Sequence, residues 1–278
     1  MDNYFRLFAG LLILVGMPTA SQAQYETDPN RPEQNFRWPD GVKAAVSLTF
    51  DDARPSQLDN GIPILDKYGI QATFYVVPGN MEQRADEWKQ AAAEGHELGN
   101  HSLTHPCTGN FAFASDKALE GYTLEAMARE LDEANRRIQE IAGVRPKTFA
   151  YPCGQTFVGR GLDTRSYVPL VAERFLAGRL WLSEDANNPA FCDLAQVLGM
   201  ESDGKSFAEI KTLIDKAVQD GSWLVLAGHD IGPPARQTTL ATTLEAFCQY
   251  ARNHTDEIWV APVQEVAGYI TAHRENLP

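Results

Sequence analysis

Two pairs of side chains in this sequence have the types and spacing that bind a metal ion and activate water. Asp51 and Asp52 directly follow the apolar run at residues 44–50. Because neighbouring strand residues point to opposite faces, one Asp could bind a metal ion while the other acts as a base. His101 and His105 are spaced i and i+4, so on a helical turn both imidazoles would lie about 6 Å apart and could meet one divalent ion.

Each pair also has an ordinary explanation when it is taken alone. Two adjacent aspartates are typical of a turn or a helix cap. Two histidines at this spacing are common on protein surfaces, and the sequence lacks the Glu after the first His that marks zincin proteases. The proposed chemistry therefore needs further partners elsewhere in the chain.

A third histidine and a tight turn could supply those partners. The buried-looking strand at residues 223–227 leads to His229, where an imidazole could titrate near neutrality and protonate a leaving group. A structural histidine is the alternative. Residues 149–154 predict a strand that runs into a tight turn, whose free N–H groups could face a developing oxyanion.

The elements that must position these residues alternate between strand and helix. Strands are predicted at 44–50, 72–77, 97–100, 148–151, 223–227 and 258–261, with further strands near 180 and 194. Helices are predicted at 57–68, 82–94, 123–141, 207–219, 239–253 and 263–273. About seven parallel strands in this length favour a closed barrel over an open doubly wound sheet. In both architectures the active site gathers at the carboxyl ends of the strands.

Length and charge limit the classes of function. The 278 residues, 44% of them hydrophobic, are enough for one large core and predict a single catalytic domain. The formal net charge of -13 argues against nucleic acid and anionic membranes as partners, but it does not exclude a neutral or cationic substrate. No Gly-x-Gly-x-x-Gly or P-loop sequence is present, so a nucleotide cofactor has no support.

The first residues predict export. Arg6, an apolar run at 7–17 and small residues ending at Ala23 are typical of a signal peptide, here residues 1–23. The run is about half of the ~20 apolar residues that span a bilayer, so we expect removal rather than anchoring, no membrane span afterwards, and a secreted or periplasmic protein. Residues 24–41, polar and proline-punctuated, predict an arm or linker, followed by the catalytic domain at 42–278.

Export makes the four cysteines candidates for disulfides. Cys107, Cys153, Cys192 and Cys248 allow three pairings, and sequence alone does not choose among them. We favour a bridge between Cys107 and Cys153, because each lies beside one of the motifs above. A thiolate nucleophile is the rival role, but no helix start or basic cluster is evident that would depress either thiol's pKa.

Taken together and in this order, the motifs resemble those of the polysaccharide deacetylases of carbohydrate esterase family 4, also called the NodB-homology domain. Residues 49–52 look like the family's first motif and residues 101–105 like its second. Residues 149–154 are similar to the third motif, and the strand ending in His229 to the last. The resemblance covers roughly residues 42–270.

The resemblance implies a distorted (β/α) barrel of about seven parallel strands with a divalent ion at its mouth. Asp52, His101 and His105 would bind this ion, most commonly zinc, with cobalt or nickel as alternatives. Three protein ligands leave an open position for water, whose pKa a bound cation lowers toward ~7.

The resemblance also implies the roles of the residues around the ion. Asp51 would be the base that activates the water, and His229 the acid that protonates the leaving group. The backbone N–H of Cys153 would help to hold the oxyanion. The same turn supplies candidate substrate contacts, which are Tyr151, Pro152 and Gly154.

Two departures from the family pattern need an explanation from the fold. Ala150 stands where the family often has an Arg that orients the base. Candidate replacements for this Arg are Arg54, Arg160 and Arg179. The family's Asp-Trp pair, which supports the acid histidine, is also not evident. Candidates for it are Asp185 near Trp181, Asp193 and Asp230.

The predicted function is metal-dependent removal of acetyl groups from a carbohydrate polymer or oligomer. The bond is an N-acetyl amide or an O-acetyl ester, and the sequence does not separate the two. One alternative is a catalytically weak, metal-containing carbohydrate-binding protein. The other is a hydrolase of a small non-peptide amide, against which the export signal argues. No obligate protein partner is inferred.

Overall fold

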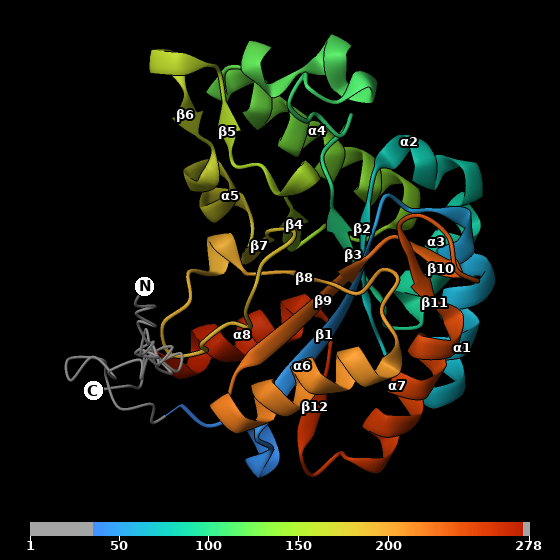
Figure 1. The fold of residues 1–278 in the computed structure, drawn as a ribbon. Helices are drawn as coiled ribbons and strands as arrows, with labels where there is room; N and C mark the ends of the chain where they lie inside the picture. The colour runs from blue at the N-terminus through green and yellow to red at the C-terminus, as the bar shows by residue number, and fades with distance from the viewer. Residues whose placement is uncertain (1–35, 275–278) are drawn as a thin grey trace, which may run out of the picture. The chain divides into compact units, whose positions relative to one another are not determined.

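β1 (Ala44–Asp51) lies inside a parallel sheet that forms the centre of the molecule (Figure 1). The structure is a computed structural model that describes residues 36–274, so the predicted signal peptide and most of the arm lie outside the described residues. The strands are ordered β7-β4-β3-β2-β1-β9-β8, and β12 also pairs with β1. Their bounds are β2 (Thr73–Val76), β3 (Glu97–Asn100), β4 (Thr148–Ala150), β7 (Ala177–Arg179), β8 (Met200–Glu201), β9 (Trp223–Gly228) and β12 (Ile258–Val260).

The segment that leads into β8 closes this sheet. Leu180 N–H donates to the Val197 carbonyl over 2.7 Å, and Val197 N–H donates to the Gly178 carbonyl over 2.8 Å, so this segment contacts β7. Three residues later Met200 pairs with Leu226 of β9. The two ends of the curled sheet are thus joined, which confirms the predicted distorted barrel.

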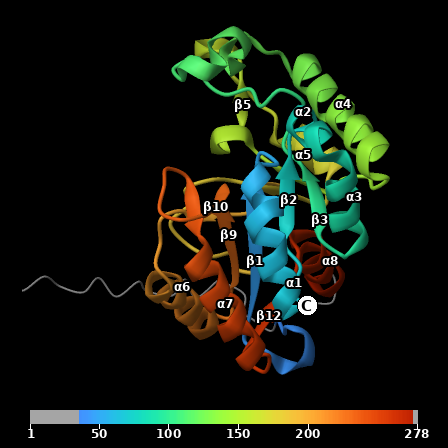
Figure 2. The same cartoon turned by 90° about the vertical axis from the view of Figure 1, so that its right-hand side faces the viewer.

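Helices cover the outside of the barrel, as the second view shows (Figure 2). Neighbouring pairs are α1 and α7, α6 and α7, and α3 and α4. The helices have the bounds α1 (Ile62–Tyr68), α2 (Pro78–Met81), α3 (Ala85–Ala93), α4 (Leu124–Ala142), α5 (Val168–Arg174), α6 (Phe207–Asp220), α7 (Ala241–Asn253) and α8 (Val263–Arg274). The remaining strands form two small sheets of two strands each. One pairs β5 (Phe157–Val158) with β6 (Arg165–Ser166) in antiparallel fashion, and the other pairs β10 (Asp230–Gly232) with β11 (Thr238–Leu240) in parallel fashion.

Local sequence explains why the long helices begin and end where they do. At the start of α4 the Thr123 side chain accepts a hydrogen bond from Ala126 N–H, and Gly143 ends the helix with a φ of 75°. At the start of α6, Ser206 and Glu209 form a capping box. None of the described helices is long and apolar enough to cross a membrane.

The end of the predicted arm packs into the core. Trp38 is 5% exposed and belongs to a buried cluster with Val263 and Ile270 of α8. Its indole N–H donates to the Gly221 carbonyl over 3.0 Å. Residues 36–41 therefore contribute to the stability of the barrel.

Most predicted elements agree with the observed ones to within about two residues, but the strand expected near residue 194 is wrong. Residues Leu194–Gln196 form a 3-10 turn, and the strand lies at Met200–Glu201. The Asp193 side chain accepts a hydrogen bond from Ala195 N–H over 2.9 Å and so offers the backbone an alternative to a strand.

Candidate active site

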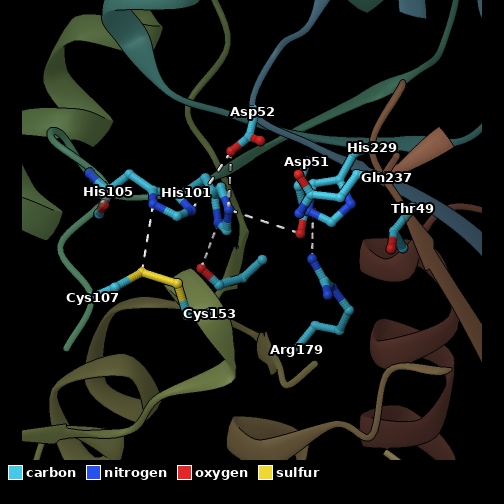
Figure 3. A network of polar contacts seen from close by, with 12 residues as sticks. Thr49, Asp51, Asp52, His101, His105, Cys107, Cys153, Arg179, His229 and Gln237 are labelled. Carbon is cyan, nitrogen blue, oxygen red and sulfur yellow. Dashed lines mark hydrogen bonds and ion pairs between the residues drawn. A yellow bond between two sulfur atoms is a disulfide. The ribbon is translucent and has the colours of Figure 1, made fainter. Parts of the chain in front are cut away.

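Asp51 and Asp52 lie at the carboxyl end of β1, where the chain turns sharply (Figure 3). Asp51 is the last residue of the strand and is 4% exposed. Asp52 and Ala53 have φ values of 78° and 56°, in the left-handed region. Backbone conformations of this kind in residues other than glycine are costly and concentrate at functional sites. The turn directs the two neighbouring carboxylates toward different partners.

His101 and His105 lie on a loop after β3, so the predicted helical turn is wrong. Ser102 and His105 have φ values of 63° and 55°, which no right-handed helix allows. The Asn100 side chain accepts from Ser102 N–H over 2.6 Å, and Ser102 Oγ accepts from His105 N–H over 3.0 Å. These bonds fold the loop tightly enough to bring the two imidazole centroids to 4.7 Å.

The two histidines converge on Asp52. Its Oδ1 atom is 3.7 Å from His101 Nε2 and 3.6 Å from His105 Nε2, and the three ligand atoms lie within 4.8 Å of one another. Ligand atoms around a tetrahedral zinc ion are ~3.3 Å apart, so the two distances from Asp52 Oδ1 to the imidazoles are within a few tenths of an ångström of that value. The Ala150 carbonyl lies 2.9 Å from His101 Nδ1, which leaves Nε2 for a metal ion.

Arg54 holds the other oxygen of Asp52. Its Nε and Nη2 atoms donate to Asp52 Oδ2 over 3.1 and 2.9 Å. Its Nη1 atom donates to Asp230 over 2.7 Å, so this guanidinium joins two carboxylates. Burial would raise the pKa of Asp52, but His101 and His105, together with Arg54, keep it below its usual value.

Arg179 contacts Asp51 from the strand next to the one that carries Ala150. Ala150 and Arg179 are register partners on β4 and β7, and Arg179 Nη2 donates to Asp51 Oδ1. Among the three candidate arginines, this is the one that contacts Asp51. Burial would raise the pKa of Asp51, yet Arg179, with His101 and His229, lowers it to about 2. The carboxylate is therefore ionised and oriented.

Asp203 supports His229. Asp203 Oδ2 lies 2.7 Å from His229 Nδ1, and Asp203 Oδ1 accepts the His229 backbone N–H over 3.1 Å. Trp181 packs edge-on against the imidazole at 4.9 Å between centroids. Burial would lower the pKa of His229, but Asp203 and Asp51 outweigh it and raise this pKa above its usual value.

The predicted partners of the acid histidine were therefore wrong, except for the tryptophan. Asp203 follows β8 by two residues, and this strand escaped prediction because it has only two residues. The available signal was a polar stretch, residues 201–203, after the short apolar run at 197–200. The earlier candidates have other contacts: Asp230 pairs with Arg54, Asp185 with Lys216, and Asp193 caps the turn after it.

A disulfide joins the histidine loop to the turn after β4, as predicted. It links Cys107, two residues beyond His105, to Cys153, while Cys192 and Cys248 are free. Because the bridge occupies both sulfurs, neither can act as a thiolate nucleophile. Burial raises the pKa of the Cys248 thiol to about 12, which also opposes such a role.

Replacing the disulfide cysteines with serine, in the double variant Cys107→Ser/Cys153→Ser, should lower the free energy of unfolding by about 2–4 kcal/mol. The bridge spans 46 residues, and cross-linking a segment of that length removes entropy from the unfolded chain. Urea denaturation with and without reductant measures the change. Cys192→Ser is the control, and an unchanged midpoint in the double variant would contradict the prediction.

The same turn carries Cys153 with a φ of 54°. The N–H groups of two nearby residues are already hydrogen-bonded. Tyr151 N–H donates to the Arg179 carbonyl, and Gly154 N–H donates to the Tyr151 carbonyl. Gly154 must remain small, because a Cβ atom there would lie 2.9 Å from Trp181 Cβ. The Tyr151 hydroxyl donates to the buried Ala195 carbonyl over 2.7 Å, and Pro152 is buried.

The candidate metal ligands, the candidate base and the candidate acid border one cavity of about 660 Å³. Asp51, Asp52, His101, His105, Cys153 and His229 line it. A second group of His105, Cys107 and Cys153 has ligand atoms at similar separations, but two of them are the sulfurs of the disulfide. The donor set that fits a divalent ion is therefore one carboxylate and two imidazoles, next to an oriented carboxylate and a supported histidine.

Known proteins are similar to this chain in sequence and in fold. A family model described as polysaccharide deacetylase matches residues 39–160. A chitooligosaccharide deacetylase from Rhizobium leguminosarum is 33% identical over 34% of this chain and 39% of its own length. A peptidoglycan-N-acetylglucosamine deacetylase from Bacillus cereus is 31% identical over 41% of this chain and 38% of its own length. The chain spans less than half the length of the first curated relatives it matches.

The fold is shared over a larger part of the chain. The crystal structure of a putative polysaccharide deacetylase from Mycobacterium smegmatis superposes with a TM-score of 0.64 at 19% identity, covering 89% of this chain and 96% of the other. At this identity the likeness concerns the fold, and the chemistry has to be argued from the site.

Proposed function

We propose that this chain, which belongs to the polysaccharide deacetylase family, uses a divalent metal ion to remove acetyl groups from a carbohydrate outside the cytoplasm. The observation that supports this most directly is the convergence of Asp52, His101 and His105 beside Asp51 and His229 in one cavity. The predicted signal peptide, which lies outside the described residues, agrees with a secreted or periplasmic enzyme.

Asp52, His101 and His105 would hold the ion, most commonly zinc in sites with one carboxylate and two imidazoles. When bound, the ion would polarise the acetyl carbonyl and lower the pKa of a water molecule toward ~7. Arg54 fixes Asp52 Oδ2 and so presents Oδ1 to the two histidines. The Ala150 carbonyl fixes His101 in the same way through Nδ1.

Asp51 is the proposed base. Arg179 anchors its Oδ1 atom, so the other oxygen can accept a proton from water as that water attacks the acetyl carbon. The Cys153 N–H donates to the carbonyl oxygen as negative charge develops there. Tyr151, Pro152 and Gly154 would act by shaping this turn, because the Tyr151 hydroxyl is bonded to the Ala195 carbonyl and the other two residues have no polar side chain.

His229 is the proposed acid. Asp203 binds its Nδ1 atom, so the protonated Nε2 can donate to the leaving nitrogen or oxygen as the C–N or C–O bond breaks. Acetate and a free amine or hydroxyl are the products. Catalysis requires a protonated acid and an ionised base at the same pH. The lowered pKa of Asp51 and the raised pKa of His229 favour that combination.

Asp203→Asn should move the alkaline limb of the rate-versus-pH profile to lower pH. In the wild type, Asp203 helps to raise the pKa of His229, so the protonated acid persists to higher pH. Removing the carboxylate charge lowers that pKa, and the acid is lost earlier as pH rises. Profiles of kcat between pH 5 and 10 measure the shift. The exposed Asp185→Asn is the control, and coincident profiles would refute the role of Asp203.

Acetate release by the metal-stripped and then zinc-reloaded protein tests the function. Acetylated xylan and N-acetylglucosamine oligomers are compared side by side. Release from either substrate that depends on zinc supports the proposal and identifies the bond. No release from either, with one zinc ion bound per chain, would instead favour the metal-containing binding protein or a small amide substrate.

A further inference from the structure

The cavity contains more cationic than anionic side chains, although the whole chain has a formal net charge of -13. Its carboxylates are Asp51 and Asp52, and its cations are Arg54, Lys117 and Arg236. This local excess of positive charge would attract anionic ligands into the cleft, because concave walls of low dielectric concentrate the electric field.

Both carboxylates already have a guanidinium partner. Asp51 pairs with Arg179, which is fully buried, and Asp52 pairs with Arg54. Arg54 is shared with Asp230. The three carboxylates thus share two guanidinium groups, which leaves one negative charge. A divalent ion on Asp52 and the histidines would add two positive charges and make the sum positive.

Lys117 and Arg236 remain available. Lys117 Nζ donates to the Thr104 carbonyl, a neutral acceptor that positions the ammonium beside the histidine loop without cancelling its charge. Arg236 is on the loop between β10 and β11, next to Gln237, whose side chain accepts from Arg54. Within residues 36–274, no carboxylate forms an ion pair with either cation.

An apolar wall lies beside Lys117. The rings of Phe111 and Phe113 stack at 5.4 Å and are 43% and 59% exposed, and both line the cavity. Aromatic faces of this kind can cover the C–H face of a sugar ring. The cleft thus offers a sugar one apolar wall and two cations from different elements.

From these contacts we infer that the substrate is an acetylated saccharide that bears a carboxylate, which Lys117 and Arg236 bind. This inference rests on the proposed function and names its substrate class. It agrees with the net charge, because that charge opposes long polyanions at the outer surface, whereas a single carboxylate is attracted into a cleft that Lys117 and Arg236 line.

Matched pairs of substrates test the inference. One pair is an O-acetylated xylo-oligosaccharide with a single uronic acid and its methyl ester, and the other is an N-acetylglucosaminyl-N-acetylmuramic acid disaccharide and its methyl ester. Within the pair that is turned over, kcat/KM should be about tenfold higher for the acid than for the ester. In Lys117→Gln/Arg236→Gln this ratio should fall close to one, since each exposed ion pair accounts for a few-fold.

Lys89→Gln/Arg145→Gln removes the same net charge from exposed positions outside the cavity and should keep the wild-type ratio. Equal kcat/KM values for acid and ester in the wild type would overturn the inference, as would equal ratios in the wild type and the cleft variant. Either result leaves the proposed function intact if acetate is released.

Binding provides a readout that does not depend on turnover. Calorimetry of the zinc-loaded protein with the deacetylated uronic acid oligosaccharide and its methyl ester should show tighter binding of the acid, with a difference that shrinks as salt rises. Equal affinities would contradict the inference. Selective binding of the acid together with no acetate release from any substrate would refute the proposed function and keep the carboxylate site.

Discussion

Asp51→Asn is expected to lower kcat about a thousandfold while zinc content stays at one ion per chain. An amide cannot accept the proton of the attacking water, and general bases typically contribute factors of 10²–10⁴. Zinc should remain because the proposed ligand atoms belong to Asp52, His101 and His105. Acetate release and metal analysis on the same protein samples measure both quantities.

Two further variants make this result specific. His101→Ala should lose both zinc and activity, because it removes one of three ligand atoms and the bond to the Ala150 carbonyl. Asp86→Asn, at an exposed position on α3, should change neither quantity. A loss of zinc in Asp51→Asn would mean that Asp51 is a ligand, and full activity in that variant would remove it as the base.

Arg179→Ala should lower the free energy of unfolding by about 3–5 kcal/mol and kcat about a hundredfold. Arg179 is fully buried and donates to Asp51, so its removal leaves a buried carboxylate without its guanidinium partner. It also leaves the base without its anchor, and small displacements of catalytic groups cost factors of this size. Denaturant unfolding and kcat measure the two effects.

The register of the barrel offers a rescue. Ala150 and Arg179 are partners on adjacent strands, so Ala150→Arg/Arg179→Ala returns a guanidinium from the neighbouring strand into the space that Arg179 vacated. This double variant should regain part of both losses. Arg136→Ala, which removes an exposed arginine, should cost no more than ~1 kcal/mol. A double variant as impaired as Arg179→Ala would show that the anchor acts only from β7.

The sequence alone predicted the barrel and the order of its elements. The spacing of apolar residues within a segment shows whether the segment buries one face as a strand or as a helix, and this spacing can be read without knowing the fold. The strands at 44–50 and 97–100 were identified nearly to the residue. The same periodicity placed Asp51, Asp52 and His229 after strands, where parallel sheets gather their functional groups. The spacing of His101 and His105 was informative even though its structural explanation was wrong.

The tertiary structure decided which distant residues support these groups. Arg179 and Asp203 lie 128 and 26 positions along the chain from the residues they contact, and neither belongs to a recognisable motif. Their roles follow from strand register and from how the sheet curls, both of which depend on packing over the whole barrel. The histidine loop is a similar case, because side-chain hydrogen bonds from Asn100 and Ser102 set its left-handed turns. A sequence pattern records types and spacing, whereas the partner of a buried charge is fixed by which strands become neighbours.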